Sequence, residues 1–272
     1  MARTLTDLAI VALLCRTSDR LAGGARGAAA LADELAERTG AQARMVGSPG
    51  TCHVGGWEED LRAAHGCLLE AGGQVEDALA AGRQPVLTAS DCSICMTTLP
   101  TVARLVPDVR VLWLDAHGDF NTPASTVSGF LGGMCLAGAC GCWDTGFHGA
   151  MEPEHVVMVG SRDVEPLESD ALDRAGVARL DAFSDVTDAV DGHQVYVHLD
   201  LDVLDPDVFP AQFPAPGGLS DAGLTHLLEE VRQAADAIVG IEVTAFEAPE
   251  DAGERSRLTL LAADAVTPLL AV

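Results

Sequence analysis

The sequence predicts an α/β fold with a mostly parallel sheet that carries helices on both faces. Short apolar runs alternate with longer helical patterns along the chain, as expected for parallel strands joined by right-handed crossovers. Hydrophobic residues make up 48% of the 272 positions, which is enough to bury a large core. Because no linker, repeat or low-complexity segment interrupts the alternation, we expect a single domain over residues 1–272.

The expected strands are short apolar runs, and the expected helices are longer stretches with helical spacing. We expect strands at Leu8–Cys15, Ala43–Val46, Pro85–Thr88, Val111–Leu114, Val156–Val159, Val195–Leu199 and Ile238–Val243. We expect helices at Gly23–Glu37, Asp60–Ala81, Leu167–Ala175, Asp221–Ala235 and Ala252–Leu270, and one more that closes at Val102–Leu105. Ser220 precedes the Asp221 helix and is its expected N-cap.

The composition excludes several classes of function. The formal net charge of −25 argues against nucleic acid or an anionic membrane as a partner, because their phosphates would be repelled. All 16 basic residues are arginine, and the lack of lysine excludes Schiff-base chemistry, pyridoxal-phosphate attachment and a P-loop lysine. We find no convincing signal peptide and no apolar run long enough to span a membrane. We therefore expect a cytoplasmic protein whose eight cysteines are reduced.

Hard metal ligands follow two of the expected strands. Asp115, His117 and Asp119 follow one, and Asp200 and Asp202 follow another. Such pairs alone are common on loops, but ligands of parallel sheets bind at the carboxyl ends of strands, where both motifs fall. Four carboxylates and one imidazole cannot be buried together without cations, so we expect two divalent ions with shared carboxylates. The oxygen-rich donor set favours Mn²⁺ over Zn²⁺, and two such ions could lower the pKa of a shared water.

At these residues the sequence resembles the ureohydrolase (arginase/agmatinase) family. The matching segments occur in the family's order and cover most of the chain from about Pro85 onward; they are Asp115–Pro123, Ser128–Gly129, Gly160–Asp163, Asp200–Pro206 and Gly217–Ser220. The resemblance implies a three-layer α/β/α domain that hydrolyses guanidino groups with two manganese ions, commonly as a trimer or hexamer. Further runs near Gly132–Met134, Gly138–Gly141 and Trp143–Gly146 are similar to members that act on Nω-hydroxy-L-arginine in antibiotic biosynthesis.

The resemblance also implies roles for individual residues. Asp115 and Asp200 would bridge the two ions; His117 and Asp202 would complete one ion, and Asp119 the other. Asp119 would also accept a hydrogen bond from the attacking hydroxide and take up its proton.

For the substrate, Asn121 and Ser128 match positions that hold the α-carboxylate. Asp163, Glu165 and Glu168 lie in the loop that would meet the α-amino group, although an ordinary acidic loop also explains them.

Three positions depart from the family's pattern. Most members carry a metal-ligating histidine where this chain has Cys92, so we expect a thiolate ligand there, the alternative being a small buried cysteine that touches no metal. The proton-shuttle histidine aligns with Gly132 and is absent, and His148 is a candidate substitute. Ala245 stands where relatives carry the glutamate that holds the guanidinium, and a methyl group cannot pair with a cation.

Three explanations of Ala245 remain open. The substrate lacks a guanidinium, Glu247 reaches in from a shifted loop, or the alanine replaces a natural glutamate in an inactivated variant. We favour the third, because the rest of the site, apart from Cys92 and Gly132, is intact.

The expected function is hydrolysis of a guanidino C–N bond of arginine or Nω-hydroxy-L-arginine, giving ornithine plus urea or hydroxyurea. One alternative is hydrolysis of another guanidino compound, such as agmatine or a guanidino acid. The other is a non-catalytic homologue that binds a metal or a ligand. The expected partner is a small guanidino molecule, and both a monomer and a homo-oligomer remain open.

Overall fold

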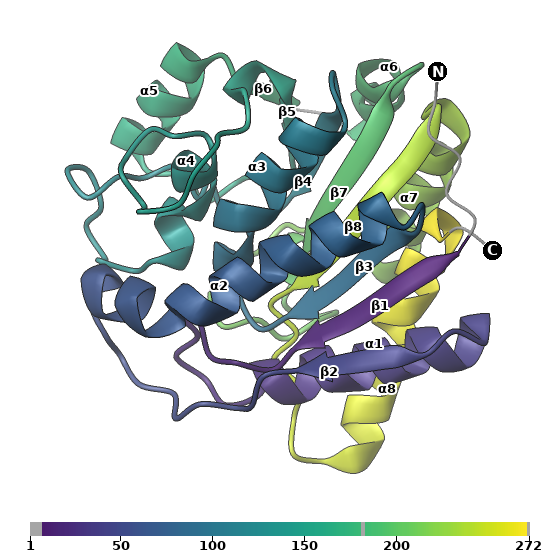
Figure 1. The fold of residues 1–272 in the computed structure, drawn as a ribbon. Helices are drawn as coiled ribbons and strands as arrows, with labels where there is room; N and C mark the ends of the chain where they lie inside the picture. The colour runs from purple at the N-terminus through teal and green to yellow at the C-terminus, as the bar shows by residue number, and fades with distance from the viewer. Residues whose placement is uncertain (1–6, 181–182, 271–272) are drawn as a thin grey trace.

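The computed structural model describes residues 7–180 and 183–270, and a single eight-stranded parallel sheet forms its centre (Figure 1). The strand order is β2-β1-β3-β8-β7-β4-β5-β6. The strands are β1 (Leu8–Leu13), β2 (Ala43–Val46), β3 (Gln84–Ala89), β4 (Arg110–Leu114), β5 (Val156–Val159), β6 (Ala178–Leu180), β7 (Gln194–Asp200) and β8 (Ala237–Thr244). All seven expected strands are present. The three-residue edge strand β6 was not expected, because Ala-Arg-Leu is too short to show a pattern.

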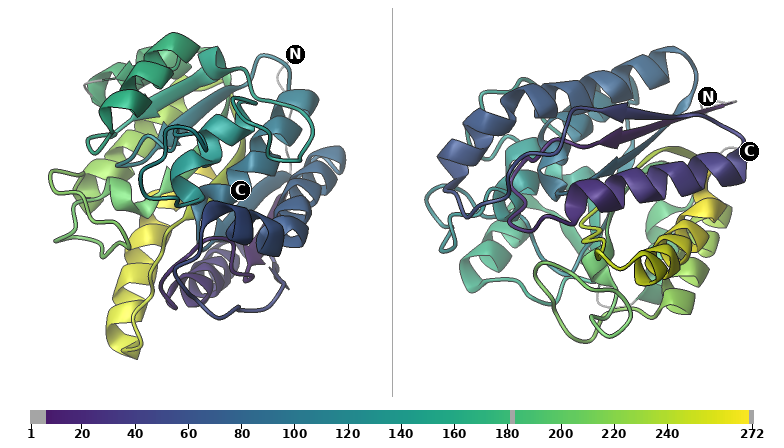
Figure 2. Two further views of the ribbon diagram at one scale, coloured as in Figure 1. Left: turned by 90° about the vertical axis from the view of Figure 1, so that its left-hand side faces the viewer. Right: turned by 90° about the horizontal axis from the view of Figure 1, so that it is seen from below.

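Helices cover both faces of the sheet, which confirms the predicted three-layer α/β/α fold (Figure 2). They are α1 (Gly24–Thr39), α2 (Trp57–Ala80), α3 (Cys95–Leu105), α4 (Cys135–Ala139), α5 (Pro166–Ala175), α6 (Val186–Val190), α7 (Asp221–Ala234) and α8 (Ala252–Val266). Successive side chains of a strand point to opposite faces of the sheet, so neighbouring residues belong to the two different hydrophobic cores that flank it. In β4, Leu112 and Leu114 pack with α1, α7 and α8, whereas Val111 and Trp113 pack with α2 and α3.

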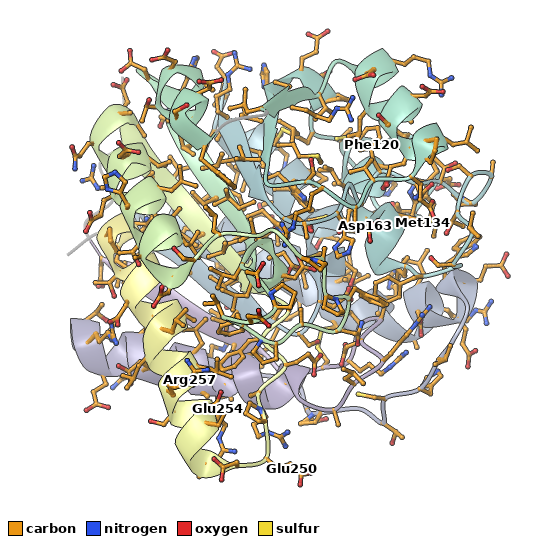
Figure 3. All side chains as sticks on the ribbon, turned by 180° about the vertical axis from the view of Figure 1, so that it is seen from behind. Phe120, Met134, Asp163, Glu250, Glu254 and Arg257 are labelled. Carbon is orange, nitrogen blue, oxygen red and sulfur yellow. A yellow bond between two sulfur atoms is a disulfide. The ribbon has the colours of Figure 1, made fainter. Side chains whose placement is uncertain are left out.

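Local chemistry explains where the last two helices begin and end. The Ser220 hydroxyl accepts a hydrogen bond from Gly223 N at 3.0 Å, so the expected N-cap of α7 is confirmed. The last helix was expected to reach Leu270, but α8 ends at Val266, because Pro268 has no N–H to continue the helical bonding. Glu254 and Arg257 form an exposed ion pair near the start of α8 (Figure 3).

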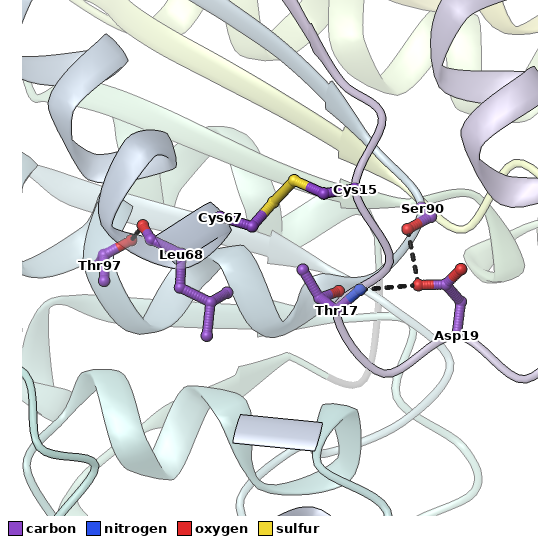
Figure 4. Close-up of a disulfide and its surroundings, with 7 residues drawn as sticks. All are labelled: Cys15, Thr17, Asp19, Cys67, Leu68, Ser90 and Thr97. Atoms are coloured by element: carbon purple, nitrogen blue, oxygen red, sulfur yellow. Dashed lines mark hydrogen bonds between the residues drawn. A yellow bond between two sulfur atoms is a disulfide. The ribbon is translucent and has the colours of Figure 1, made fainter. Parts of the chain in front are cut away.

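A disulfide joins Cys15, just after β1, to Cys67 on α2 (Figure 4). The expectation that all eight cysteines are reduced is therefore wrong for this pair, and the other six are free. The pairing has no local signal, since the two residues are 52 positions apart and meet only because α2 packs across β1.

Within the part of the chain that the structure describes, no helix is both long enough and apolar enough to cross a membrane.

Gly27 allows α1 to approach the segment that follows β8. A Cβ at Gly27 would overlap the carbonyl oxygen of Phe246 and lie 2.7 Å from its ring Cγ. We expect Gly27→Ala to lower the free energy of unfolding by about 1–3 kcal/mol, the usual cost of overpacking. Gly66 is the matched control, because it is exposed on α2 and a Cβ there would meet nothing within 4 Å.

Gly66→Ala should raise the free energy of unfolding by about 0.5–1 kcal/mol, since alanine loses less backbone entropy in a helix. Urea denaturation of both variants checks the pair. Equal effects of the two substitutions would contradict the close approach at Phe246.

Candidate metal centre

The two acidic motifs found in the sequence meet at one edge of the sheet. Asp115 directly follows β4 and Asp200 ends β7, and these strands are neighbours with Leu114 opposite Leu199. Cys92 lies in the turn after β3, and Thr244 ends β8. Because all these strands are parallel, their carboxyl ends place the side chains around one cluster.

Close contacts link the members of this cluster. The His117 Nδ1 atom lies 3.0 Å from Asp202 Oδ2 and 3.4 Å from Asp115 Oδ1. The Cys92 thiol donates to Asp200 Oδ2 at 2.8 Å and lies 3.0 Å from the Thr244 hydroxyl oxygen. Ligand atoms of Asp115, His117 and Asp202 all lie within 4.8 Å of one another.

The buried carboxylates of the cluster lack enough positive charge among the side chains. Burial, followed by the charge of Asp202, raises the pKa of Asp115 to about 6. Burial and neighbouring carboxylates raise the pKa values of Asp119 and Asp200 well above the ordinary range. Only Asp202 is shifted down, because hydrogen bonding to His117 outweighs its burial.

These observations test whether divalent ions fit the site. Asp115 Oδ2 is buried and has no hydrogen-bond partner among the described residues. Burial and Asp200 also raise the pKa of the Cys92 thiol, so without a cation the sulfur keeps its proton. A bound cation would give the buried oxygen of Asp115 a partner, and it would favour the ionised forms of the Cys92 thiol and of the four carboxylates beside it. The donor set therefore fits divalent metal ions.

A pocket of about 420 Å³ opens over this cluster. The candidate metal ligands line it. So do all five residues predicted to bind the substrate, which are Asn121, Ser128, Asp163, Glu165 and Glu168. Asn121 Nδ2 donates to Glu165 Oε2 at 3.0 Å, so these two side chains form one polar wall.

Glu168 differs from the other four. Its Oε1 accepts from Phe120 N at 2.8 Å, and its Oε2 accepts from Glu165 N at 3.2 Å as part of the capping box of α5. The carboxylate therefore joins the segment that follows Asp119 to the start of α5.

Ala245, the departure at the guanidinium-binding position, lines the pocket, and so does Glu247, its suggested replacement. Ala245 lies in the pocket wall with a left-handed backbone, at φ 61°. Glu247 lies in the same wall, where its Oε2 accepts from Gly23 N at 3.0 Å, and burial followed by the charges of Asp19 and Asp91 raises its pKa to about 7.

Gly132 also lines the pocket, but His148 lies elsewhere, in a cavity shared with Pro100 and His155. The prediction that His148 replaces the proton shuttle is therefore wrong, because His148 lines a different cavity from the one over the candidate metal ligands.

The sequence reading missed His198, which is fully buried on β7. Its ring nitrogen, Cys92 Sγ and an Asp115 carboxylate oxygen lie within 4.8 Å of one another. The signal was available, since side chains two positions apart on a strand share a face, and His198 precedes Asp200 by two.

Comparisons with known proteins agree with this geometry. The family model described as Arginase family matches residues 24–271. The N(omega)-hydroxy-L-arginine amidinohydrolase of Streptomyces lavendulae is 36% identical over 257 residues, which cover 93% of each chain. Two solved arginases superpose over 98% of both chains: that of Bacillus caldovelox, at 25% identity and a TM-score of 0.80, and that of Bacillus cereus, at 26% identity and 0.81.

Proposed function

Because the chain belongs to the arginase family of metal-dependent hydrolases, we propose that it hydrolyses a guanidino C–N bond of Nω-hydroxy-L-arginine or arginine with two manganese ions. The products are ornithine and hydroxyurea or urea. The observation that carries this proposal is the convergence of Cys92, Asp115 and Asp200 with the substrate-facing residues in one pocket. The 36% identity to an amidinohydrolase that is named for hydroxyarginine supports that choice of substrate.

The proposed ligand set divides the cluster between two ions. Asp115 and Asp200 would be shared by both ions, His117 and Asp202 would complete one, and Asp119 and Cys92 would complete the other. The proposed ligands are therefore Cys92, Asp115, His117, Asp119, Asp200 and Asp202. When bound, the ions supply a water of lowered pKa and stabilise developing negative charge.

The protein's own groups orient the reaction. The Cys135 thiol donates to Asp119 Oδ2 at 3.4 Å, which leaves Asp119 Oδ1 to accept the proton of the attacking water. The wall of Asn121, Ser128 and Glu165 is assigned to the amino-acid end of the substrate.

The guanidinium end would face Ala245 and Glu247. Since Glu247 already lies in the pocket wall, its position supports the second explanation of Ala245, that a nearby glutamate replaces the missing carboxylate. Ala245 is also the observation that favours the alternative, hydrolysis of agmatine or a guanidino acid.

The test of the function is a substrate panel with the manganese-loaded protein. Release of ornithine from hydroxyarginine or arginine supports the proposal, and turnover of only agmatine or a guanidino acid supports the alternative. Two bound ions without any turnover would indicate a binding protein instead.

The third explanation of Ala245, that the alanine replaces a natural glutamate, has its own test: under it, Ala245→Glu should raise the turnover of a guanidino amino acid by about 10–100-fold, the usual value of one charged hydrogen bond. The substitution adds no new backbone strain beyond what alanine already bears at φ 61°. Ala245→Gln has the same shape without the charge and is the matched control. An equal gain in both variants, or no gain, would rule out a missing glutamate at this position.

The binding of a cationic substrate should improve as pH rises through about 7. Glu247 has its pKa raised to about 7 by burial and then by Asp19, so it becomes a carboxylate only above that pH. We expect KM to fall across this range and Glu247→Gln to remove the dependence. The same shift favours the protonated form in the folded state, so this group's contribution to stability is full below about pH 4.5 and is lost as pH rises toward 7.

KM profiles of the two proteins, with denaturation at pH 4.5 and pH 7.5, measure both effects. A KM profile that is identical in the Glu247→Gln variant would exclude Glu247 from substrate binding.

A further inference from the structure

His198 is held rigidly beneath the metal cluster by its two neighbouring strands. In the sheet it pairs with Trp113 of β4 on one side and with Glu242 of β8 on the other. Its ring stacks on the Trp113 indole, with centroids 3.6 Å apart and an interplanar angle of 2°. The Nδ1 atom lies 2.6 Å from Glu242 Oε1. The imidazole is therefore fixed in both position and rotation.

The partner carboxylate is itself held in place. Glu242 Oε2 accepts hydrogen bonds from the Thr98 hydroxyl at 2.6 Å and from the Tyr196 hydroxyl at 2.8 Å. All of these side chains are buried. Since a carboxylate can only accept, Nδ1 of His198 carries the hydrogen, and the lone pair lies on Nε2.

No described protein atom donates a hydrogen bond to that lone pair. Nε2 of His198 is buried and has no hydrogen-bond partner among the described residues, and the same is true of Asp115 Oδ2. Buried polar atoms are nearly always paired in native proteins. Two such atoms in the same cluster indicate a shared partner that is not a protein atom.

A metal ion fits as that partner. Cys92 Sγ, an Asp115 carboxylate oxygen and a His198 ring nitrogen lie within 4.8 Å of one another. Donor atoms around one tetrahedral ion lie about 3.5 Å apart, given bonds of about 2.0–2.3 Å. A histidine whose other nitrogen donates to a carboxylate is the usual arrangement of a metal ligand.

We propose that His198 Nε2 directly ligates the ion held by Cys92 and Asp115, with Glu242 as the residue that positions it. This inference rests on the proposed metal centre. It makes the two ions unequal, because one position has sulfur and nitrogen donors from Cys92 and His198, whereas the other is bound mainly by carboxylates. The softer position should favour Co²⁺ or Zn²⁺ over Mn²⁺ more strongly than its neighbour does.

The experiment uses Co²⁺ as the probe and needs no turnover. In the cobalt-loaded protein, proton NMR should show two hyperfine-shifted, exchangeable imidazole N–H signals, one from His117 and one from His198. His198→Gln should remove one signal and weaken the binding of one ion by more than about 100-fold. That loss exceeds the usual effect of changing a residue that only hydrogen-bonds to a metal ligand. The thiolate-to-cobalt absorption band should shift or disappear with it.

Two further variants separate ligation from a structural role. Glu242→Gln should keep both ions but move the His198 signal and weaken one ion by about 10–100-fold, as expected for loss of an orienting carboxylate. His226→Gln, on the exposed surface of α7, is the matched control and should change none of these readouts.

Several results would overturn the inference. A single shifted imidazole signal in the unmodified protein would do so even if no variant folds, as would two unchanged ions in His198→Gln. Binding of no Co²⁺ would remove the inference together with the metal centre. Two ions and both imidazole signals without guanidino hydrolysis would leave the ligand assignment standing and contradict only the proposed function.

Discussion

Asp200→Asn is expected to abolish the proposed turnover and to release at least one of the two proposed metal ions. Asp200 is buried at the end of β7, where its Oδ2 accepts from the Cys92 thiol at 2.8 Å, and we assign it to both ions. Losing one preorganised electrostatic group at a reacting centre already costs about 10²–10³ in turnover, so loss of a shared ligand should cost at least that much. Metal analysis and ornithine release measure the two effects.

The same substitution should stabilise the metal-free protein. Burial and then the charges of Asp202 and Asp115 raise the pKa of Asp200 well above its usual range, so its ionisation opposes folding. A carboxyl group with a raised pKa in the folded state stabilises the protein most below its unfolded pKa, and this contribution is lost as pH rises. The metal-free variant should therefore have a higher Tm than the metal-free parent at neutral pH, and the difference should shrink in acid.

Glu254→Gln is the control for a lost surface carboxylate. Glu254 pairs with Arg257 on α8, away from the labelled pocket residue Asp163 (Figure 3). It should not change the metal content, and it should not raise Tm at neutral pH, because the hydrogen bond from Arg257 lowers the pKa of Glu254 instead of raising it. A metal-free Asp200→Asn protein that is less stable than its parent and still binds two ions would contradict the assignment of Asp200.

The parts of the site that the sequence predicted are those whose signal is local. Asp115 and Asp200 each follow a short apolar run, so a few consecutive residues show both the strand and the ligand at its end. That the two strands are neighbours is a long-range fact, because β4 and β7 pair across two intervening strands of the chain. The expectation that they meet came from the parallel-sheet rule and from the need of buried carboxylates for cations, and the family resemblance then supported it.

The features that were missed depend on contacts between distant segments. His198 reads as one polar interruption in an apolar strand, and only the pairing of β7 with β8 places Glu242 beside it. The Cys15–Cys67 disulfide likewise depends on how α2 crosses the sheet. His148 was misplaced because a loop residue carries no periodicity from which its direction can be read.

Asp119→Asn should lower turnover by about 10²–10⁴-fold, the usual range for loss of a general base, while leaving the fold intact. Asp119 has a left-handed backbone at φ 49°, and its carbonyl oxygen accepts from Leu136 N at 3.0 Å and from Ala137 N at 3.2 Å. Asparagine tolerates this conformation as well as aspartate does, so the loop and the start of α4 should be retained. The amide oxygen can still bind a cation, but it cannot take up a proton from water.

Asp108→Asn is the matched control for this change, because Asp108 is exposed and also left-handed, at φ 60°, in the turn before β4. It should alter neither stability nor turnover, so any loss in Asp119→Asn comes from the carboxylate and not from the backbone. Turnover should be measured at saturating Mn²⁺, because Asp119 is also assigned to one ion. If Asp119→Asn then retained turnover within about 10-fold of the parent, the proton of the attacking water would have to go to another group, and Asp119 would be a metal ligand alone.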